Sequence, residues 1–313
     1  MQHSEFPPAL QAQIEAGAEQ EPCPSCGTLS FIRGTSKGAK VLRCPNCTLH
    51  FLNASVRPLS DLDNSWYADM NHDVVTQGAG FLQAMEKSYR AQLQSLAKLT
   101  DGRRILDVGC GVGVFLASAK KLGWDVQGTD ASANAAKFAK LAYGLDYVSD
   151  CRSLPAHSFD VVRASHVLEH VPEPTSFLSE LRRLVKPGGV VQIVVPNNEP
   201  LLNGFVNAWR AKRSDRPNLA LSVYPVMHCL GLTPKALATL AKNAGFVELS
   251  AFCVSRGNSA YYPWDYDGLL NRMGMREFMR NRRRVLPEMA AMLGNPFGLG
   301  SWQVGLYRSP ESS

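Results

Sequence analysis

Short apolar runs alternate with amphipathic segments from residue 104 to the end of the chain. The runs have the length of buried strands, and the segments between them repeat apolar residues at helical spacing. This alternation predicts an α/β fold with a mostly parallel sheet. The strands are expected at residues 104–109, 125–130, a segment ending near 150, 159–166, 190–197, 247–254 and 301–308.

Helix-start signals support the same division of the chain. Ser132 is a suitable N-cap for one helix, and Thr233 with Pro234 is a suitable start for another. The helices are expected at residues 114–123, 131–144, 174–185 and 233–246.

At 313 residues the chain can form one large domain and a smaller one. Two segments, 198–230 and 255–300, are expected to be inserts that form a lid over the substrate. The remaining division is a flexible tail (1–20), a cysteine module (21–60), connecting helices (61–100) and a main domain (101–313).

Composition narrows the class of protein. Apolar residues make up 45% and charged residues 19%, which is an ordinary globular balance. The net charge of +6 is compatible with nucleic acid or an acidic substrate, but decides for neither. No apolar run reaches the about 18–20 residues that span a bilayer, and the first twenty residues do not resemble a signal peptide. We therefore expect a cytoplasmic protein with reduced cysteines and no membrane span.

Four cysteines near the N-terminus have the spacing of a zinc ribbon. Cys23 and Cys26 form one C-x2-C pair, and Cys44 and Cys47 form a second. Two such pairs can complete a tetrahedral four-thiolate shell around a structural Zn²⁺ ion. A redox pair or inert thiols are the alternatives. The module is too short to bury a core of its own, so metal binding is expected to supply most of its folding energy.

The second cysteine pair departs from the pattern in one detail. Gly27 follows the first pair and can supply the positive φ that such a turn needs. Thr48 follows the second pair, where glycine would be expected.

A glycine-rich loop, DVGCGVG, follows the first expected strand. Glycines here let the backbone approach a ligand and turn into a helix whose first N–H groups favour anions. Dinucleotide-binding folds use a similar loop, but the G-x-G-x-G spacing and the acid Asp107 inside the strand argue against NAD. Asp130 ends the second strand and could accept hydrogen bonds from the ribose of NAD or of another cofactor.

Four segments carry a more specific resemblance. ILDVGCGVGVFL, GWDVQGTDAS, SFDVVRASHVLEHVPEP and LVKPGGVVQIVVPN, in this order, resemble class I S-adenosylmethionine-dependent methyltransferases. They are most similar to the branch that includes ubiquinone-biosynthesis O-methyltransferases, and the likeness continues through HCLGLTPKALATLAKNAGF. Many bacterial members resemble this chain also in an N-terminal four-cysteine module. The resemblance implies a Rossmann-like seven-stranded sheet with an antiparallel last strand, and S-adenosylmethionine as cofactor.

The resemblance also implies which residues contact the cofactor. The loop would hold the methionine part, the second strand the ribose, and the next two connections the adenine and the sulfonium. The matching residues are Asp107, Gly109, Gly111 and Gly113 for methionine, Asp130 for the ribose, Ala131, Asp150 and Cys151 for the adenine, and His166 for the sulfonium and the substrate mouth.

The stretch HVLEH (166–170) also fits H-x-x-E-H, the inverted zinc-peptidase signature. A peptidase needs both histidines on one helix face, whereas this stretch follows a strand and precedes VPEP. Three histidines, His166, His170 and His228, are instead candidates for a general base. A second interpretation places a divalent cation on Glu169 and His170, with or without His166.

The leading functional interpretation is a methyltransferase for a small metabolite, sugar or lipid-linked acceptor, with O- or N-methylation favoured over C-methylation. The arginine-rich segment 275–289 has two interpretations: a solvated helix face, or a cleft wall that recognises a phosphate or carboxylate on the acceptor, to which 209–217 could contribute. An RNA methyltransferase of the rRNA-guanine type is one alternative, which the dispersed basic residues disfavour without excluding. A non-catalytic scaffold that keeps the fold is another. The sequence does not determine the oligomeric state.

Overall fold

The computed structural model describes residues 19–36, 38–52, 78–199, 207–214, 223, 228–254 and 300–311. The expected tail up to residue 18, most of the insert at 198–230 and nearly all of the insert at 255–300 lie outside the described residues. None of the helices in the described part is long and apolar enough to cross a lipid bilayer.

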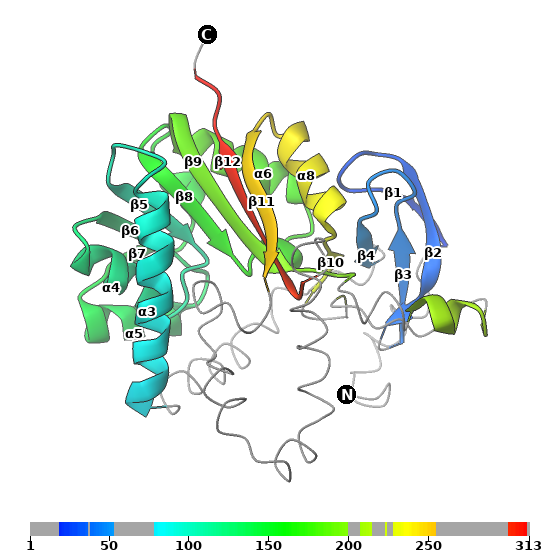
Figure 1. The fold of residues 1–313 in the computed structure, drawn as a ribbon, viewed down its shortest axis with the longest axis horizontal. Helices are drawn as coiled ribbons and strands as arrows, with labels where there is room; N and C mark the ends of the chain where they lie inside the picture. Colours follow the sequence, from blue (N-terminus) through cyan, green and yellow to red (C-terminus); the bar gives the residue numbers. More distant parts are fainter. Residues whose placement is uncertain are drawn as a thin grey trace.

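A seven-stranded sheet forms the centre of the main domain (Figure 1). Most neighbouring strands are parallel, and the last strand in sequence runs antiparallel to both of its neighbours. The predicted Rossmann-like architecture is therefore confirmed. In spatial order the strands are β11 (Val247–Val254), β12 (Trp302–Arg308), β9 (Val185–Pro196), β8 (Phe159–Ser165), β5 (Arg104–Val108), β6 (Asp125–Thr129) and β7 (Tyr147–Val148).

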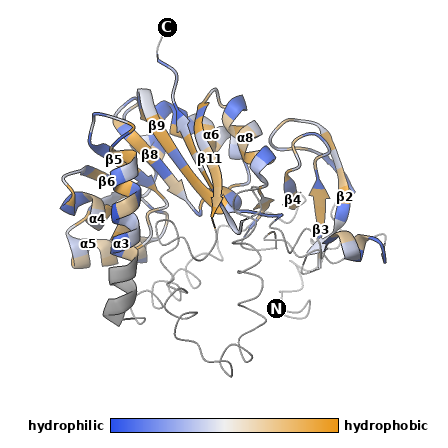
Figure 2. Cartoon of the chain, viewed as in Figure 1, coloured by the Kyte–Doolittle hydropathy of each residue, from blue (hydrophilic) through white to orange (hydrophobic). Residues whose placement is uncertain are grey.

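Helices cover both faces of this sheet, and its central strands are strongly hydrophobic (Figure 2). Successive strand residues face opposite sides: Val161 lies in one apolar cluster and Val162 in the other. Ser132 and Thr233 cap their helices as predicted, because each side chain accepts a hydrogen bond from a backbone N–H in the first turn. On one side lie α3 (Gly78–Leu96), α4 (Val114–Lys121) and α5 (Ala133–Tyr143), and on the other α6 (Pro174–Leu184) and α8 (Pro234–Asn243).

Two strands differ in length from the sequence prediction. The third strand is reduced to Tyr147–Val148, which pairs only with β6. The strand expected at 190–197 begins at Val185, because Val185 pairs with Phe159 before a register shift in β8. An irregularity of this kind lets a Pro-Gly-Gly stretch stay within a strand.

A second sheet contains the N-terminal residues and one strand from the main domain. Its order is β1-β2-β3-β4-β10, and β10 lies more than 170 residues after β4 in the chain. The module lies beside α8 in Figure 1. The strands are β1 (Gln20–Pro22), β2 (Leu29–Ser36), β3 (Ala39–Arg43), β4 (His50–Leu52) and β10 (Leu230–Gly231).

The cysteine module shares its core with the main domain. Leu42, Leu49 and Phe51 are buried in the same apolar cluster as Leu168 and Leu237. The expectation that metal supplies most of the folding energy is therefore incomplete, because apolar burial against the main domain also stabilises these strands.

A buried ion pair joins the two central strands. Asp107 of β5 and Arg163 of β8 are register partners, and Arg163 Nη1 donates to Asp107 Oδ1 at 2.8 Å. The side chains are only 2% and 7% exposed. The Arg163 guanidinium lies over the rings of Phe115 and Tyr89, which shield the pair from water. Burial raises the pKa of the Asp107 carboxyl, and Arg163 opposes that effect.

The pair makes a stability prediction. Arg163→Met leaves the Asp107 carboxylate buried without its cation, so we expect a loss of about 3–5 kcal/mol in the free energy of unfolding in urea. The double variant Arg163→Met/Asp107→Leu removes both charges and should recover most of that loss. A single variant as stable as the parent would contradict this account of the sheet.

Candidate functional site

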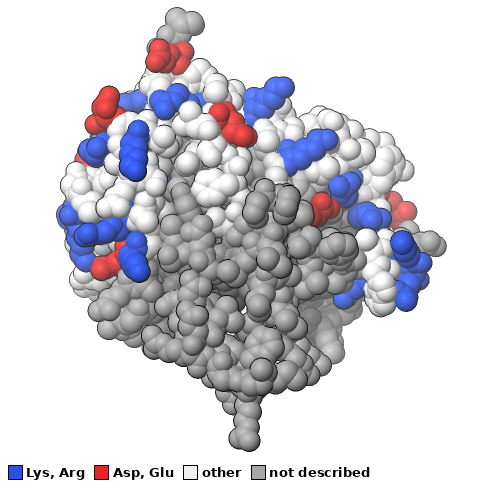
Figure 3. Space-filling view, viewed as in Figure 1, with Lys and Arg blue, Asp and Glu red and all other residues white. Residues whose placement is uncertain are grey.

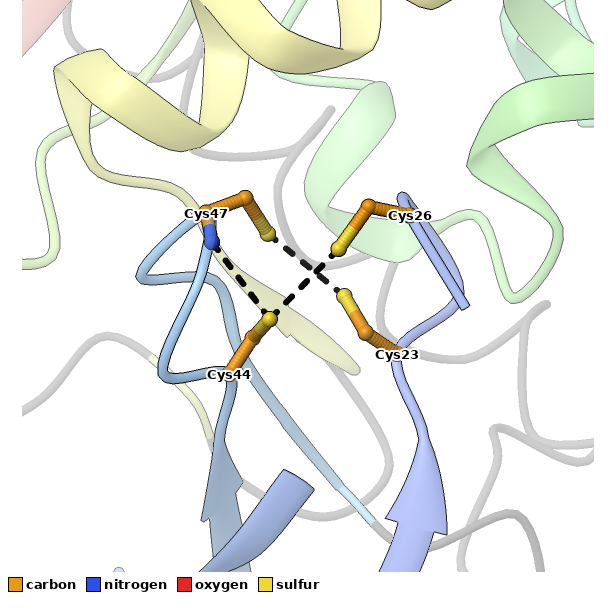
Figure 4. Close-up of side chains that lie close together, drawn as sticks. All are labelled: Cys23, Cys26, Cys44 and Cys47. Atoms are coloured by element: carbon orange, nitrogen blue, oxygen red, sulfur yellow. Dashed lines mark hydrogen bonds between the residues drawn. The ribbon is translucent and has the colours of Figure 1, made fainter. Parts of the chain in front are cut away.

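The four N-terminal cysteines converge on one point (Figure 4). Cys23 Sγ lies 3.5 Å from Cys47 Sγ, and Cys26 Sγ lies 3.5 Å from Cys44 Sγ. All four Sγ atoms lie within 4.8 Å of one another. A tetrahedral Zn²⁺ site with 2.3 Å bonds places its sulfurs about 3.8 Å apart. The thiols therefore fit such a site without rearrangement.

Backbone groups favour thiolates in this cluster. Ser25 N donates to Cys23 Sγ and Cys47 N donates to Cys44 Sγ, both at 3.4 Å. The hydrogen bond between the two thiols lowers the pKa of Cys47 to about 5 and raises the pKa of Cys23. Because the thiolate is the metal-binding form, the two backbone donors suit a metal ion.

The unexpected threonine in the second knuckle now has a structural reason. Gly27 and Thr48 both have positive φ, 71° and 65°. A side chain in this region costs of order 1–3 kcal/mol. The Thr48 hydroxyl lies 2.6 Å from the hydroxyl of Thr233, the N-cap of α8. Threonine thus links the knuckle to the main domain, which glycine could not do.

The glycine loop lies between the end of β5 and the start of α4. Gly109, Gly111 and Gly113 all have positive φ. A Cβ at Gly109 would meet Val167 Cγ2 at 2.4 Å, and one at Gly113 would meet Tyr147 Oη at 2.2 Å. The space above Gly111 is open. The loop therefore packs closely on two sides and leaves its middle accessible, and no side chain caps the first turn of α4.

Asp130 ties the end of β6 to this loop. Its Oδ2 accepts a hydrogen bond from Gly111 N at 2.7 Å, and its Oδ1 accepts one from Ser132 N at 2.8 Å. The residue is buried. Ala131, which follows it, is exposed. The carboxylate thus lies against the backbone that the sequence assigned to the cofactor.

Asp150 and Cys151 lie after β7, beyond the same edge of the sheet. Asp150 caps the short 3-10 helix Cys151–Ser153 by accepting a hydrogen bond from Arg152 N at 2.9 Å. Hydrogen bonds from Arg152 hold the pKa of the Asp150 carboxyl below its usual range. Cys151 is half-buried. Since β5, β6, β7 and β8 run parallel, their carboxyl ends lie at the same end of the sheet, and the predicted cofactor residues gather there.

His166 leaves the end of β8 in a left-handed conformation, with φ 58°. Its Nδ1 lies 3.3 Å from Glu169 Oε1, and its ring meets the edge of Trp302 at 4.5 Å between centroids. A non-glycine residue in this conformation is strained, and such strain concentrates at functional sites. Val167 next to it packs on Gly109, so this turn also contacts the cofactor loop.

Glu169 is a buried carboxylate surrounded by histidines. It is 1% exposed. Burial favours its neutral form, but His166, with His170 and His228, prevails and lowers the pKa of Glu169. The rings of His170 and His228 lie edge to face, 4.7 Å apart. Glu169, His170 and His228 each offer one ligand atom within 4.8 Å of the others. Among the described residues, the candidate cation ligands are therefore Glu169, His170 and His228. The sequence had suggested His166 as the possible third ligand instead of His228.

The HVLEH stretch does not form the peptidase arrangement. It begins directly after β8 and contains a 3-10 helix of three residues, Leu168–His170, rather than a longer helix. Only His170 of the two motif histidines belongs to the candidate ligand group among the described residues.

A family model for a methyltransferase domain matches residues 81–251, more than half of the chain. The chain belongs to this methyltransferase family. The matched range begins within α3, ends within β11 and includes the glycine loop, Asp130 and the Glu169 cluster. The cysteine module lies before it.

Curated relatives of this methyltransferase include ubiquinone biosynthesis O-methyltransferases. The protein from Bordetella avium is 36% identical over 118 residues, 34% of this chain and 48% of the relative. The protein from Albidiferax ferrireducens is 32% identical over 164 residues, 49% of this chain and 59% of the relative. The alignments thus span only about half the length of these relatives. A solved S-adenosylmethionine-dependent methyltransferase from Archaeoglobus fulgidus aligns with 76% of this chain and 98% of its own, at 20% identity and a TM-score of 0.49.

The sequence did not predict a role for two residues near the site, Arg163 of β8 and Trp302 of β12. Arg163 is a charge inside an apolar strand, which could have indicated a buried partner for Asp107. Trp302 reaches His166 only because β12 returns antiparallel to β9, where Trp302 pairs with Pro196. No local pattern near residue 302 could have indicated that contact.

Proposed function

We propose that this protein transfers a methyl group from S-adenosylmethionine to an oxygen or nitrogen of a small-molecule acceptor. The observation that carries the proposal is the glycine loop with Asp130 beneath it, inside a methyltransferase family domain. The ubiquinone-biosynthesis relatives support an O-methyl product. When bound, the cofactor would supply the methyl group from its sulfonium.

The chain's own residues would divide the work at the carboxyl edge of the sheet. The Gly109–Gly113 backbone and the first turn of α4 suit the methionine carboxylate. Asp130 suits the ribose hydroxyls, Asp107 would lie with the glycines near the methionine part, and Ala131, Asp150 and Cys151 would line the adenine side. Alignment and exclusion of water are the main demands of such a transfer.

The Glu169 cluster lies next to this region and suits the acceptor. An acceptor hydroxyl must lose a proton, and a neutral histidine near a carboxylate can take it. We assign this role to His166, because its Nδ1 contacts Glu169 and its side chain is 43% exposed. His170 and His228 lie close enough to Glu169 to help lower the pKa of its carboxyl.

The charge distribution favours a small acceptor over RNA. On the face shown in Figure 3 the described Lys and Arg side chains are dispersed along the left, top and right of the view, with Asp and Glu among them. An RNA groove would need a continuous basic track with stacking aromatics. Arg213 lies over the exposed ring of Trp209, 3.8 Å from its centroid. An anionic group on the acceptor would suit such a pair.

We also propose that the four cysteines hold one Zn²⁺ ion in a structural role. The four thiolates would fill its coordination shell and leave no position for a substrate.

The cofactor assignment is tested by ligand binding. Adenosylhomocysteine should co-purify with the protein and be identified by mass spectrometry; a nicotinamide dinucleotide in its place would refute the assignment. Asp130→Ala should weaken calorimetric binding by about 1.5–3 kcal/mol, because charged hydrogen bonds are lost. Asp125→Ala is the matched control, since it removes an exposed acid at the other end of β6. Equal affinity of the Asp130 variant and the parent would exclude the ribose role, and absence of any binding would favour a non-catalytic scaffold.

The zinc assignment predicts one zinc per chain by mass spectrometry of the metal content. Cys23→Ser and Cys44→Ser should each lose it, because three thiolates leave the tetrahedral shell incomplete. Cys253→Ser, in β11, should keep it. Retention of stoichiometric zinc by both cluster variants would contradict the assignment.

The role of the Glu169 cluster is tested by titrating zinc-loaded protein with Mn²⁺ and following its paramagnetic resonance signal. The general-base assignment predicts no saturable Mn²⁺ site that depends on Glu169. A site that is lost in both Glu169→Gln and His228→Gln but kept in His166→Gln would replace the base by a cation that activates the acceptor.

A further inference from the structure

The N-terminal cysteine module obtains its last strand from the methyltransferase domain. β10 pairs antiparallel with β4, so that Leu230 lies opposite Phe51 and Gly231 opposite His50. β10 contains only two residues, and His228 precedes it by two positions. The module therefore contacts the chain directly beside a residue of the Glu169 cluster.

Two hydrogen bonds support this pairing, one to a residue just before β10 and one to a residue just after it. Leu52 N donates to Cys229 O at 2.9 Å, on the side of His228. The hydroxyls of Thr48 and Thr233 lie 2.6 Å apart, on the other side. Both ties come from the segment that follows Cys44 and Cys47. The conformation of that segment is in turn set by the knuckle, in which Cys44 N donates to Leu49 O and Thr48 N donates to Cys44 O.

On the side away from β4, β10 and the residue before it contact the Glu169 turn and the segment after β9. Cys229 Sγ donates to the main-chain oxygen of Glu169 at 3.5 Å. Gly231 approaches Asn198 so closely that a Cβ would lie 2.6 Å from its side chain. β10 is thus held between β4 on one side and the end of β9 and the Glu169 turn on the other, with little room for movement.

A separate contact joins the module to the end of β9. Glu199 Oε1 lies 3.5 Å from Arg43 Nε and 3.6 Å from His50 Nε2. The His50 side chain is buried. Glu199 follows Asn198, the residue that Gly231 packs against. The module therefore reaches the acceptor side of the site by two routes.

We propose that the cysteine module is a positioning element of the methyl-acceptor site, and that metal binding by its thiolates holds His228 beside Glu169 and His170. The proposal rests on the proposed function only in taking the Glu169 cluster as the acceptor side. Cys229, Thr48 and Leu52 are the positioning residues, since they act through β10. Among the described residues the cofactor loop meets the module only indirectly, through Val167 of the Glu169 turn, so its ligand affinity should depend far less on the metal.

The physical reason lies in the second knuckle. Without a metal, the turn at Cys44–Cys47 keeps two backbone hydrogen bonds but is no longer linked to Cys23 and Cys26 by a shared ion. Thr48 then keeps its backbone hydrogen bond to Cys44 and its contact with Thr233, but the turn that imposes its strained φ of 65° is no longer held by a metal. Relaxation of Thr48 would withdraw its hydroxyl from Thr233 and disturb the β4–β10 pairing.

The test follows the ring signals of the histidines by two-dimensional NMR on full-length, zinc-loaded protein. The His228 and His170 signals, assigned with His228→Gln and His170→Gln, report the edge-to-face contact of the two rings. Cys47→Ser, and the parent protein after removal of zinc by a chelator, should both shift these two signals. The His157 signal should stay, because its Nδ1 bonds to Val185 O on another part of the sheet. Return of zinc to the stripped parent should restore the spectrum.

Two further variants separate position from metal content. Thr48→Gly keeps all four thiolates and accepts the positive φ, but removes the tie to Thr233; it should keep its zinc and still shift the His228 signal. Cys253→Ser should change neither. Unshifted His228 and His170 signals in protein shown to lack zinc would overturn the proposal.

Adenosylhomocysteine titration of the same samples distinguishes this result from a failure of the proposed function. The affinity for adenosylhomocysteine should change less than about twofold on zinc removal, because a positioning effect confined to His228 leaves the cofactor loop intact. Zinc-free protein that loses this affinity while its histidine signals stay in place would also overturn the proposal. A parent that never binds the ligand refutes the cofactor assignment, and the comparison of histidine signals still decides the positioning role.

Discussion

The Asp107–Arg163 ion pair is the interaction on which the site depends most. It joins register partners of β5 and β8, and those two strands lead directly into Gly109 and His166. A charge pair in a sheet interior is tolerated only when its geometry is good and water is kept away. Phe115 of α4 and Tyr89 of α3 keep water away, so the helices on that face also help to set the cofactor edge. Asp107 lies two residues before Gly109, so the pair is close to the start of the glycine loop.

The contact between the two sheets makes the cysteine module part of the methyltransferase domain. Its apolar residues, its knuckles and its last strand all use partners from that domain. Thr175 donates to Pro24 O, and Asn243 donates to Ser25 O, so the first knuckle is held as well as the second. The thiol cluster is thus linked through β10 to the turn that carries Glu169.

Local chemistry in the sequence predicted most of the fold. The capping residues Ser132 and Thr233, the glycine loop and the cysteine spacing each depend on neighbours within a few positions. The unpredicted features depend on register between distant strands. The pairing of β4 with β10 brings His228 to Glu169, and the return of β12 brings Trp302 to His166. No single segment contains the information for such contacts, because a shift of one residue in either strand would remove them.

The late arrival of β10 has a consequence for biosynthesis. Residues 19–52 leave the ribosome early, but the hydrogen-bonding edge of β4 gains its partner only when residue 231 has been made. Until then the module presents an unpaired strand edge, which is a template for association with other chains. Completion of the module therefore comes after translation of most of the methyltransferase domain, and an isolated N-terminal fragment would carry that open edge permanently.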